Sequence, residues 1–498
     1  MSRNVVIIGG GATAVSAFRS LVRIPGVASI CFIAPNAIGC GTAFGAGDPQ
    51  LLCNTSVDVT SLSPEGDSEL LGYLAARGWP VQRDDFVPRY LVTQYARESY
   101  LRHRADAELR GVRVMHLRGL ARSVGGTTGR YRVKLADGRS MAATDVLLCL
   151  NGTTPRLPEA LRARSASPRL LTSPYPARRL RQIPPGSSVL VVGTKLSALD
   201  AALTLCRRGL PTVMTSPSGE LPAVRTRLCR TSAAGLAQQW EEQLHRGAGP
   251  AELLRPLLRL IRALGNRRPV LPQLSRVVSV HERLRHETAQ AETGHVPWQD
   301  AVAEVIDGLN VVLPKQPEHI QRQVLAAYRG AMSRYISSIP VSNARRILAH
   351  LDSGALRVAG AYPQRIDPHP GDGWTVTWPD GRTEHVDWIV CASGFEAPSL
   401  AVTKAGELRI GAPTADGDRP AVVGHDLRIV RDPWQPPERL WALGAAAGSR
   451  FPIVNYLRAA AQHATTVARQ LSLEPWRAAH VDPAVRVPAA RLPERTSS

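Results

Sequence analysis

Residues 5–14 read Val-Val-Ile-Ile-Gly-Gly-Gly-Ala-Thr-Ala, and this stretch predicts a buried strand that turns directly into a helix. Its first four residues are apolar and β-branched, as in a strand that is covered on both faces. Gly9 permits the tight turn, Gly11 lets a pyrophosphate approach the backbone, and Ala14 lets the helix pack closely on the strand. We therefore expect Gly9, Gly11, Ala12 and Ala14 to bind a dinucleotide at the helix start. The alternative is a glycine-rich turn without a ligand.

The next strand is expected at residues 29–33, and it ends without the acidic residue that usually holds the adenosine ribose. Ala34 stands at that position, followed by Pro35 and Asn36. We expect either that Asn36 or a backbone group makes the ribose contact in place of a carboxylate, or that adenosine binds more weakly than usual.

A second strand, turn and helix are predicted from residue 188 onward, where Ser188–Val192 precede Gly193-Thr194-Lys195-Leu196-Ser197-Ala198. Lys195 replaces the middle glycine, and its ammonium group could meet a phosphate directly. The alternative is a turn that no longer binds a nucleotide and leaves Lys195 exposed. No arginine follows the next strand, residues 211–215, to indicate NADPH. The expected nucleotide contacts are Gly193, Thr194, Lys195, Ser197 and Ser216, with Arg225 and Arg227 as substitutes for the missing arginine.

Two later segments repeat one design, a strand that ends in small residues and glycine. Residues 145–153 and 387–395 each follow a predicted β-meander, with turns at 137–138 and 380–381. This duplication predicts two related nucleotide-binding units in tandem, with Gly152 and Gly394 close to the cofactors.

The pattern as a whole predicts an α/β chain with two tandem Rossmann-like domains and a helical insertion. Residues 229–351 show helical periodicity, and we expect them to cover the active cleft. The expected division is residues 1–175 and 396–475 for the first domain, 176–228 and 352–395 for the second, 229–351 for the insertion, and 476–498 for a flexible tail.

Composition excludes several classes of protein. The chain has 498 residues, of which 44% are hydrophobic and 20% charged, which is typical of a globular protein. It contains no apolar stretch of the roughly 20 residues that a membrane span needs. Its seven cysteines are scattered without a C-x-x-C pair, which argues against a disulfide framework or a zinc site and favours a reducing cytoplasm. The net charge is +20, but only four of the 61 basic residues are lysine and the arginines are dispersed, so we expect no specific nucleic-acid binding.

Several stretches of the chain have sequences typical of one known group of proteins. They are Gly39–Phe44, Leu51–Thr55, Phe86–Arg89, Gly193–Asp200, Ser216–Arg225, Trp298–Asp300, Ser393–Phe395 and Leu443–Gly444. Together they resemble the flavoproteins with two dinucleotide-binding domains. Within that group the chain is most similar to class B flavin N-monooxygenases, in particular those that form nitrosuccinate from L-aspartate in natural-product pathways.

The resemblance implies FAD in the first domain and NADPH, or else NADH, in the second. It also implies hydride transfer from nicotinamide to flavin followed by oxygen activation, with O₂ and a small amino acid as substrates. The cofactor carries such chemistry, so no catalytic residue and no metal site is predicted. Further flavin contacts are expected from Gly41, Thr42, Asn54, Gly444 and Asn455.

An anionic amino acid needs fixed donors for its carboxylates, which arginine supplies better than lysine. Arg89 and Arg225 lead because they lie in the stretches that carry the resemblance, and Arg227 and Arg334 are further candidates. An N-hydroxylase also needs a neutral amine, so either a dry pocket or a nearby base is expected, and the insertion is one source of such a base. The histidines available there are His281, His286, His295, His319 and His350.

Two other functions stay open at this point. One is an NAD(P)H-dependent flavin oxidoreductase that inserts no oxygen, and the other is a nucleotide-binding protein whose second site has decayed. The choice of NADPH over NADH, the number of oxidation rounds and the oligomeric state, monomer or homodimer, are not determined by these patterns.

Overall fold

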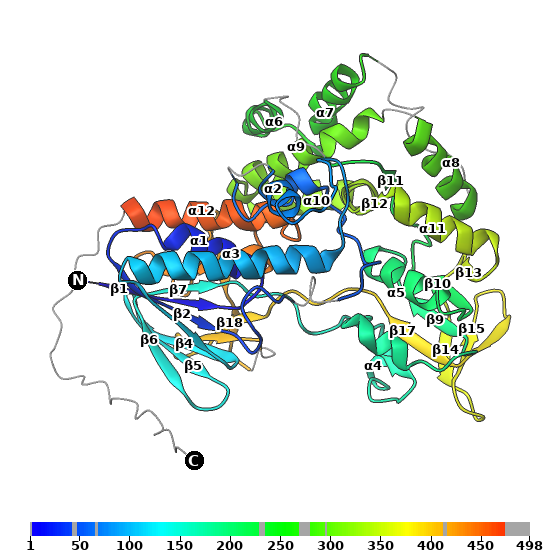
Figure 1. Cartoon of the computed structure of the whole chain (residues 1–498), viewed down its shortest axis with the longest axis horizontal. Coiled ribbons are helices and arrows are strands. Elements are labelled where there is room, and N and C mark those ends of the chain that lie inside the picture. Colours follow the sequence, from blue (N-terminus) through cyan, green and yellow to red (C-terminus); the bar gives the residue numbers. More distant parts are fainter. Residues whose placement is uncertain are drawn as a thin grey trace.

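The strand predicted at residues 5–8 is the centre of a five-stranded parallel sheet (Figure 1). The computed structural model describes residues 2–41, 47–64, 68–228, 235–267, 279–293, 296–411 and 416–473. Five of the six residues of the central strand are buried, including all four of its apolar run, residues 5–8. The strand order is β23 (Leu440–Ala442), β7 (Asp145–Leu148), β1 (Arg3–Ile8), β2 (Val27–Ile33) and β3 (Arg113–Leu117).

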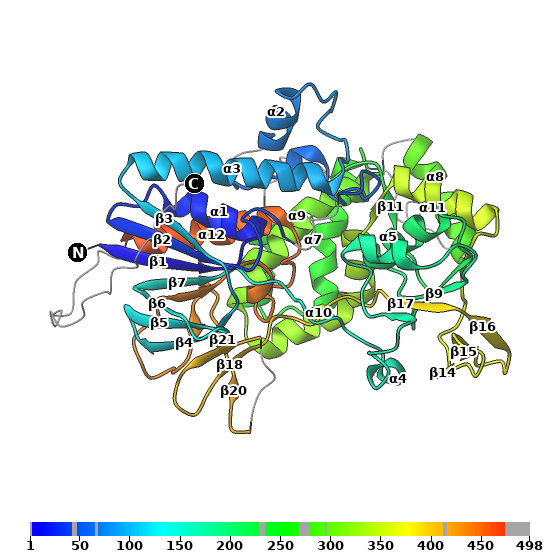
Figure 2. The ribbon, with the colours of Figure 1, turned by 60° about the horizontal axis from the view of Figure 1, so that its bottom comes forward.

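Helices cover one face of this sheet and a second, antiparallel sheet covers the other (Figure 2). The helices are α1 (Ala12–Leu21), α3 (Arg89–Leu109) and α12 (Leu457–Leu473). The predicted meander is confirmed as β4 (Ala121–Thr127), β5 (Arg130–Leu135) and β6 (Ser140–Ala143). Strands that were not predicted extend it: β19 (Leu408–Ile410) pairs with β4, followed by β18 (Leu400–Val402) and β20 (Arg419–Pro420).

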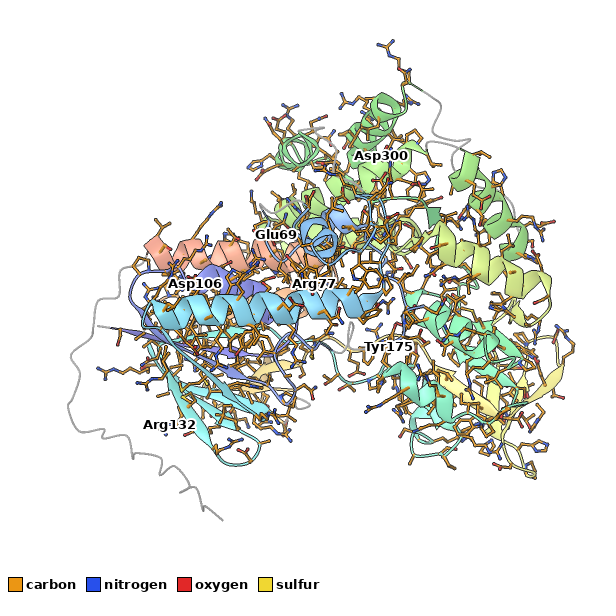
Figure 3. The ribbon with its side chains drawn as sticks, in the orientation of Figure 1. Glu69, Arg77, Asp106, Arg132, Tyr175 and Asp300 are labelled. Atoms are coloured by element: carbon orange, nitrogen blue, oxygen red, sulfur yellow. The ribbon has the colours of Figure 1, made fainter. Side chains whose placement is uncertain are left out.

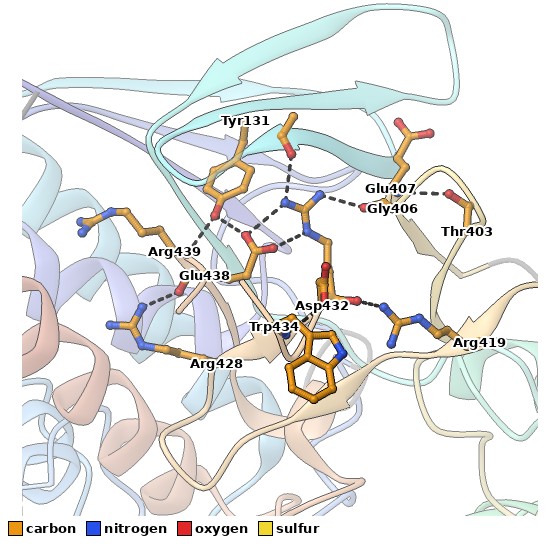
Figure 4. A network of polar contacts seen from close by, with 12 residues as sticks. Tyr131, Thr403, Gly406, Glu407, Arg419, Arg428, Asp432, Trp434, Glu438 and Arg439 are labelled. Carbon is orange, nitrogen blue, oxygen red and sulfur yellow. Dashed lines mark hydrogen bonds and ion pairs between the residues drawn. The ribbon is translucent and has the colours of Figure 1, made fainter. Parts of the chain in front are cut away.

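A buried polar network joins these two sheets (Figure 4). The Tyr131 hydroxyl donates to Glu438 Oε2 at 2.6 Å, and Arg431 Nε donates to Glu438 Oε1 at 2.8 Å. The backbone N–H of Arg439 donates to the Tyr131 oxygen, and Arg439 Nε donates to Asp145 Oδ1 at 2.7 Å, at the start of β7. The outer sheet is thereby fixed to the two strands β7 and β23.

The second unit repeats this arrangement with a parallel sheet of its own. The strand order is β13 (Leu356–Val358), β10 (Thr212–Thr215), β9 (Val189–Val192), β17 (Trp388–Cys391) and β8 (Leu170–Leu171). The second predicted meander is also confirmed, as β14 (Arg365–Pro368), β15 (Trp374–Thr377) and β16 (Thr383–Val386). Because both expected parallel sheets are present, the predicted α/β class with two Rossmann-like sheets is confirmed.

Two helices from the expected insertion pack in the core of the second unit, beside α5 (Leu196–Cys206). They are α8 (Val280–Thr293), through Leu284 and Ala291, and α11 (Val341–Asp352), through Ala344 and Ile347. The insertion therefore contributes to the second unit as well as to a helical group of its own, and the division at residues 229 and 351 stays a prediction.

The helical group lies across one side of both units (Figure 1). Trp240 and Leu253 pack there with Leu309 and Val324 in a separate apolar core. Its helices are α6 (Leu236–His245), α7 (Pro250–Leu264), α9 (Pro297–Val312) and α10 (Glu318–Ala331). Further short elements of the described chain include α2 (Glu69–Ala75), α4 (Glu159–Arg162), β11 (Val224–Arg225), β12 (Ile339–Pro340), β21 (Val422–Val423) and β22 (Ile429–Val430). Within the described ranges, every helix is too short or too polar to cross a membrane.

Candidate nucleotide-binding sites

The first glycine turn has the close approaches that its sequence predicted. Gly9 has φ +124°, and a Cβ atom on it would lie 2.2 Å from the carbonyl oxygen of Cys149, so only glycine fits. Its N–H donates to the carbonyl of Ile33 at 2.9 Å, which ties β1 to the end of β2. Ala14 is fully buried, so its methyl group lets α1 pack directly on the sheet.

Backbone segments from three parts of the chain meet around Gly11. A Cβ on Gly11 would lie 3.6 Å from the Cα of Gly41, and Gly444 at the end of β23 has φ +60° and abuts Thr13 in the first turn of α1. Ala12 begins that helix. Such a cradle of backbone at a helix N-terminus, free of large side chains, suits a pyrophosphate, so the residues present fit a dinucleotide. Thr42 lies outside the described residues.

Ala34 and Asn36 follow the end of β2, where the sequence predicts the contact with the ribose. Ala34 is buried, and Asn36 is exposed beside the turn, with its carbonyl oxygen 3.8 Å from where a Cβ on Gly10 would stand. The contact of Asn36 with an adenosine stays a prediction.

The second turn reproduces the first almost contact for contact. Gly193 has φ +139°, a Cβ on it would lie 2.6 Å from the carbonyl oxygen of Ala392, and its N–H donates to the Thr215 carbonyl at 2.7 Å. Thr194 is buried and fixes the following loop, since its hydroxyl lies 2.8 Å from Ser216 Oγ and donates to the Glu220 carbonyl. The duplication inferred from sequence therefore extends to individual backbone contacts.

Lys195 stands at the residue before α5 and is partly buried. Burial lowers the pKa of its ammonium group, opposed by the charge of Glu220 and reinforced by that of Arg334. The Arg283 guanidinium lies 3.1 Å from Glu220, so two side chains from the helical segment approach this turn. Ser197, in the first turn of α5, is half-buried.

Gly152 and Gly394 lie where the chain crosses between the two units. Pro155 and Phe395 form an antiparallel bridge, and the backbone N–H of Glu396 donates to the Thr154 carbonyl at 2.9 Å. A Cβ on Gly152 would lie 2.1 Å from the Glu396 carbonyl oxygen, so the pairing of the two crossings requires glycine there. Gly394 has φ +89° and open space around it.

Arg89 is engaged by the second unit rather than open to a ligand. Its Nη1 donates to Asp200 Oδ2 at 2.6 Å and to the Tyr175 hydroxyl at 3.1 Å, and its Nε donates to the Leu52 carbonyl. Figure 3 shows Tyr175 between α3, which begins at Arg89, and α5, which carries Asp200. These residues form a buried bridge between the units that sequence reasoning missed, because Asp200 lay unmarked within a predicted helix.

Two further arginines also have carboxylate partners. Arg227 makes two bonds of 2.8 Å to Asp300 on α9, and Arg334 forms a buried ion pair with Glu287. Arg225 differs from both: it is 1% exposed and donates through Nη2 to the Asn54 carbonyl, while Nε and Nη1 have no hydrogen-bond partner in the described part of the chain.

The segment before α12 is held by the helical group. Asn310 on α9 donates to the Ile453 carbonyl at 2.8 Å and accepts from the Ile453 N–H at 3.1 Å. This segment presents Asn455, which is exposed, and Tyr456, which is buried. Asn310 is a positioning residue that the sequence did not reveal, since an isolated asparagine in a helix carries no signal.

The histidines predicted as bases do not gather at either turn. His281 lies 2.7 Å from Asp352 on the surface, His286 and His319 are exposed, and burial lowers the pKa of the half-buried His350. His295 lies outside the described residues.

His463 on α12 was not predicted and lies beside the first turn. It accepts the Gly444 N–H through Nδ1 at 3.2 Å, and burial lowers its pKa to about 4. It is therefore a neutral acceptor at this turn.

The described residues contain no group of three His, Cys, Asp or Glu side chains arranged to hold a metal ion. The six cysteines among them are all free. A cavity of about 410 Å³ beside the network of Figure 4 is lined by residues of the outer sheet and its loops, including Lys404, Arg419 and Gln435, and by no residue of either glycine turn.

Comparison with known proteins supports the first turn and the overall architecture. Residues 6–153 match the family model described as FAD-NAD(P)-binding. A nitric oxide reductase FlRd-NAD(+) reductase of Aeromonas hydrophila is 32% identical over 129 residues, which are 26% of this chain and 30% of that protein. The chain thus spans about a third of the length of this relative.

Solved structures resemble the chain over nearly its whole length. The ornithine N-hydroxylase of Kutzneria sp. 744 matches with a TM-score of 0.58 at 14% identity, covering 95% of this chain and 99% of that one. The L-lysine 6-monooxygenase of Pseudomonas syringae matches with a TM-score of 0.54 at 14% identity and the same coverage. At such identity the likeness establishes the shared fold.

Proposed function

We propose that this protein is an FAD- and NADPH-dependent monooxygenase that oxidises the amino group of a small amino acid, in its most specific form L-aspartate to nitrosuccinate. The observation that carries the proposal is the pair of glycine turns with matching contacts, Gly9 to Cys149 and Gly193 to Ala392, at the ends of two parallel sheets. Two such turns suit two dinucleotides, one to supply hydride and one to receive it.

The solved structures that share the fold over 95% of this chain include enzymes named as ornithine and lysine monooxygenases, which supports oxygen insertion at an amine. The first round would consume the amine, one O₂, one NADPH and one proton, and would yield the hydroxylamine, water and NADP⁺. Bound FAD would supply the redox and oxygen chemistry. The chain would hold the two pyrophosphates at Gly11 and Lys195. It would also exclude water from the space between the two cofactors.

A reductase without oxygen insertion is the second candidate, and the match to a protein named as a reductase favours it. The two functions differ in the fate of the electrons. The test begins with purified flavoprotein that is mixed anaerobically with NADPH or NADH in a stopped-flow instrument. The reduced protein is then mixed with O₂ and L-aspartate or another amino acid. The products are identified by mass spectrometry.

Monooxygenation predicts bleaching of the oxidised flavin by NADPH and an N-oxidised product in proportion to the NADPH consumed. Reduction followed by stoichiometric hydrogen peroxide with every amino acid would instead establish the reductase. An absence of flavin reduction would support a decayed second site.

A further inference from the structure

Arg225 is a buried cation for which the described part of the chain provides no carboxylate. Among the residues that the structure describes, its one hydrogen bond is from Nη2 to the Asn54 carbonyl. Burial lowers its pKa to about 10, opposed only by Tyr456, so the guanidinium is still protonated at neutral pH. Within the described residues, the fold therefore carries a desolvated positive charge with two nitrogens that lack hydrogen-bond partners.

Such a group is costly to keep. An unpaired buried donor lowers stability because it has lost its hydrogen bonds to water without replacement, and the cost is larger when the donor is charged. The other candidate arginines obey the usual rule, since Arg89, Arg227 and Arg334 each face a carboxylate of the chain itself. An unpaired buried group in a native fold calls for an explanation, and a ligand that completes it is the simplest one.

The segment around Arg225 is rigidly held, which prepares it for a ligand. Thr226 donates through its N–H and its hydroxyl to Gln299 Oε1, both at 3.0 Å, and the double bond of Arg227 to Asp300 fixes the next residue to α9. On the other side Arg225 lies in β11, which pairs with Pro340 of β12. Receptors held in this way bind with a smaller loss of entropy.

The surroundings of Arg225 favour a substrate over a cofactor phosphate. Its guanidinium is bonded to Asn54 from the first unit and lies near Tyr456, which precedes α12, and neither residue belongs to a glycine turn. The turns at Gly11 and Lys195 already offer helix N-termini to the phosphates. What remains to be recognised is a small anion, and the planar guanidinium matches a carboxylate.

We propose that Arg225 binds the carboxylate of the substrate, so that the substrate class is an amino acid and not a diamine. This inference rests on the proposed function, since it names the substrate of the same site.

The test uses the flavin-loaded protein and thermal unfolding at constant ionic strength, with succinate, L-aspartate and 1,4-diaminobutane as probes. Succinate and L-aspartate should raise the Tm of the wild type, and the diamine should not. Arg225→Met should weaken succinate binding at least tenfold, and Arg225→Lys should weaken it less, because the charge is kept and the planar group is lost. Without ligand, Arg225→Met should melt no lower than the wild type, since it removes an unpaired buried charge.

Arg431→Met is the matched control, because Arg431 is also buried but is paired with Glu438 at 2.8 Å. That variant should melt lower and bind succinate as the wild type does. Unchanged succinate affinity in both Arg225 variants, or stabilisation of the wild type by the diamine but not by succinate, would overturn the proposal. Succinate has no amine, so its binding does not depend on N-oxidation. If Arg225→Met loses succinate binding and no amino acid yields an N-oxidised product, the monooxygenase is rejected and the carboxylate site is retained.

Discussion

Lys195 occupies in the second unit the backbone position that Gly11 occupies in the first. Both residues are extended, with φ −101° and ψ −167° for Lys195 and φ −83° and ψ −171° for Gly11, and each directly precedes the helix that follows its strand. The two turns therefore differ at this position in the side chain and not in the backbone. The first leaves the approach to the helix open, and the second places an ammonium group there.

Replacing Lys195 should weaken NADPH binding without loss of flavin. Lys195→Ala removes the cation at the helix start, and we expect NADPH affinity to fall about tenfold, which corresponds to about 1.4 kcal/mol. The measurement is the NADPH dependence of the anaerobic flavin reduction rate, with FAD content as a second readout. Lys404→Ala, an exposed lysine on the outer sheet, should match the wild type. Unaltered NADPH affinity in Lys195→Ala would mean that the lysine does not meet the phosphate.

Gly11→Asp should give soluble protein that lacks FAD. The new Cβ would lie 3.6 Å from Gly41, an ordinary contact, so the fold is expected to survive. A carboxylate at the helix start would repel the pyrophosphate. The flavin-to-protein absorbance ratio measures the loss, and Gly11→Asn separates charge from size, since it should retain more FAD than Gly11→Asp. If Gly11→Asp retained stoichiometric FAD, the pyrophosphate would not bind at this turn.

Asp200→Asn should destabilise the contact between the two units. It would leave Arg89 buried with its charge unpaired, which costs about 3–5 kcal/mol when a buried pair is broken. Thermal unfolding should show a lower Tm, and the double variant Arg89→Met with Asp200→Leu should recover part of it. Glu108→Gln breaks the exposed pair with Arg104 and should change stability by less than about 0.5 kcal/mol. If Asp200→Asn and Glu108→Gln lowered the Tm equally, the bridging role of the pair of Arg89 and Asp200 would be contradicted.

Protonation of His463 should destabilise the fold in mild acid. Its pKa in the fold is about 4, below the unperturbed value of about 6.5, so the unfolded chain binds more protons between these values. Stability should therefore fall as the pH falls through this window, by about 2 kcal/mol between about pH 7 and pH 5 from this residue. Tm measured against pH should fall less steeply for His463→Gln than for the wild type. His319→Gln, at an exposed position, should follow the wild type.

The strands, glycine turns and meanders could be predicted because their signals are local. About ten consecutive residues around each turn show the pattern of strand, turn and helix. This local pattern predicts the positive φ of Gly9 and Gly193. Strands β18, β19 and β20 gave no comparable signal, since they complete a sheet begun far earlier in the chain, as in the pairing of Leu408 with Val124. The same holds for Ile347, which packs in the core of the second unit although its helix belongs to the expected insertion.

By itself, the sequence determined that the chain contains two units of one design, each with a turn suited to a dinucleotide, because backbone conformation and apolar periodicity depend on near neighbours. Only the tertiary structure decided which arginines face a carboxylate of the chain. Arg89 meets Asp200 across 111 residues and Arg227 meets Asp300 across 73, while Arg225 meets, among the described residues, a backbone carbonyl and no carboxylate. Such pairing depends on which distant segments the packing of the two units and the helices brings together, and no local pattern encodes it.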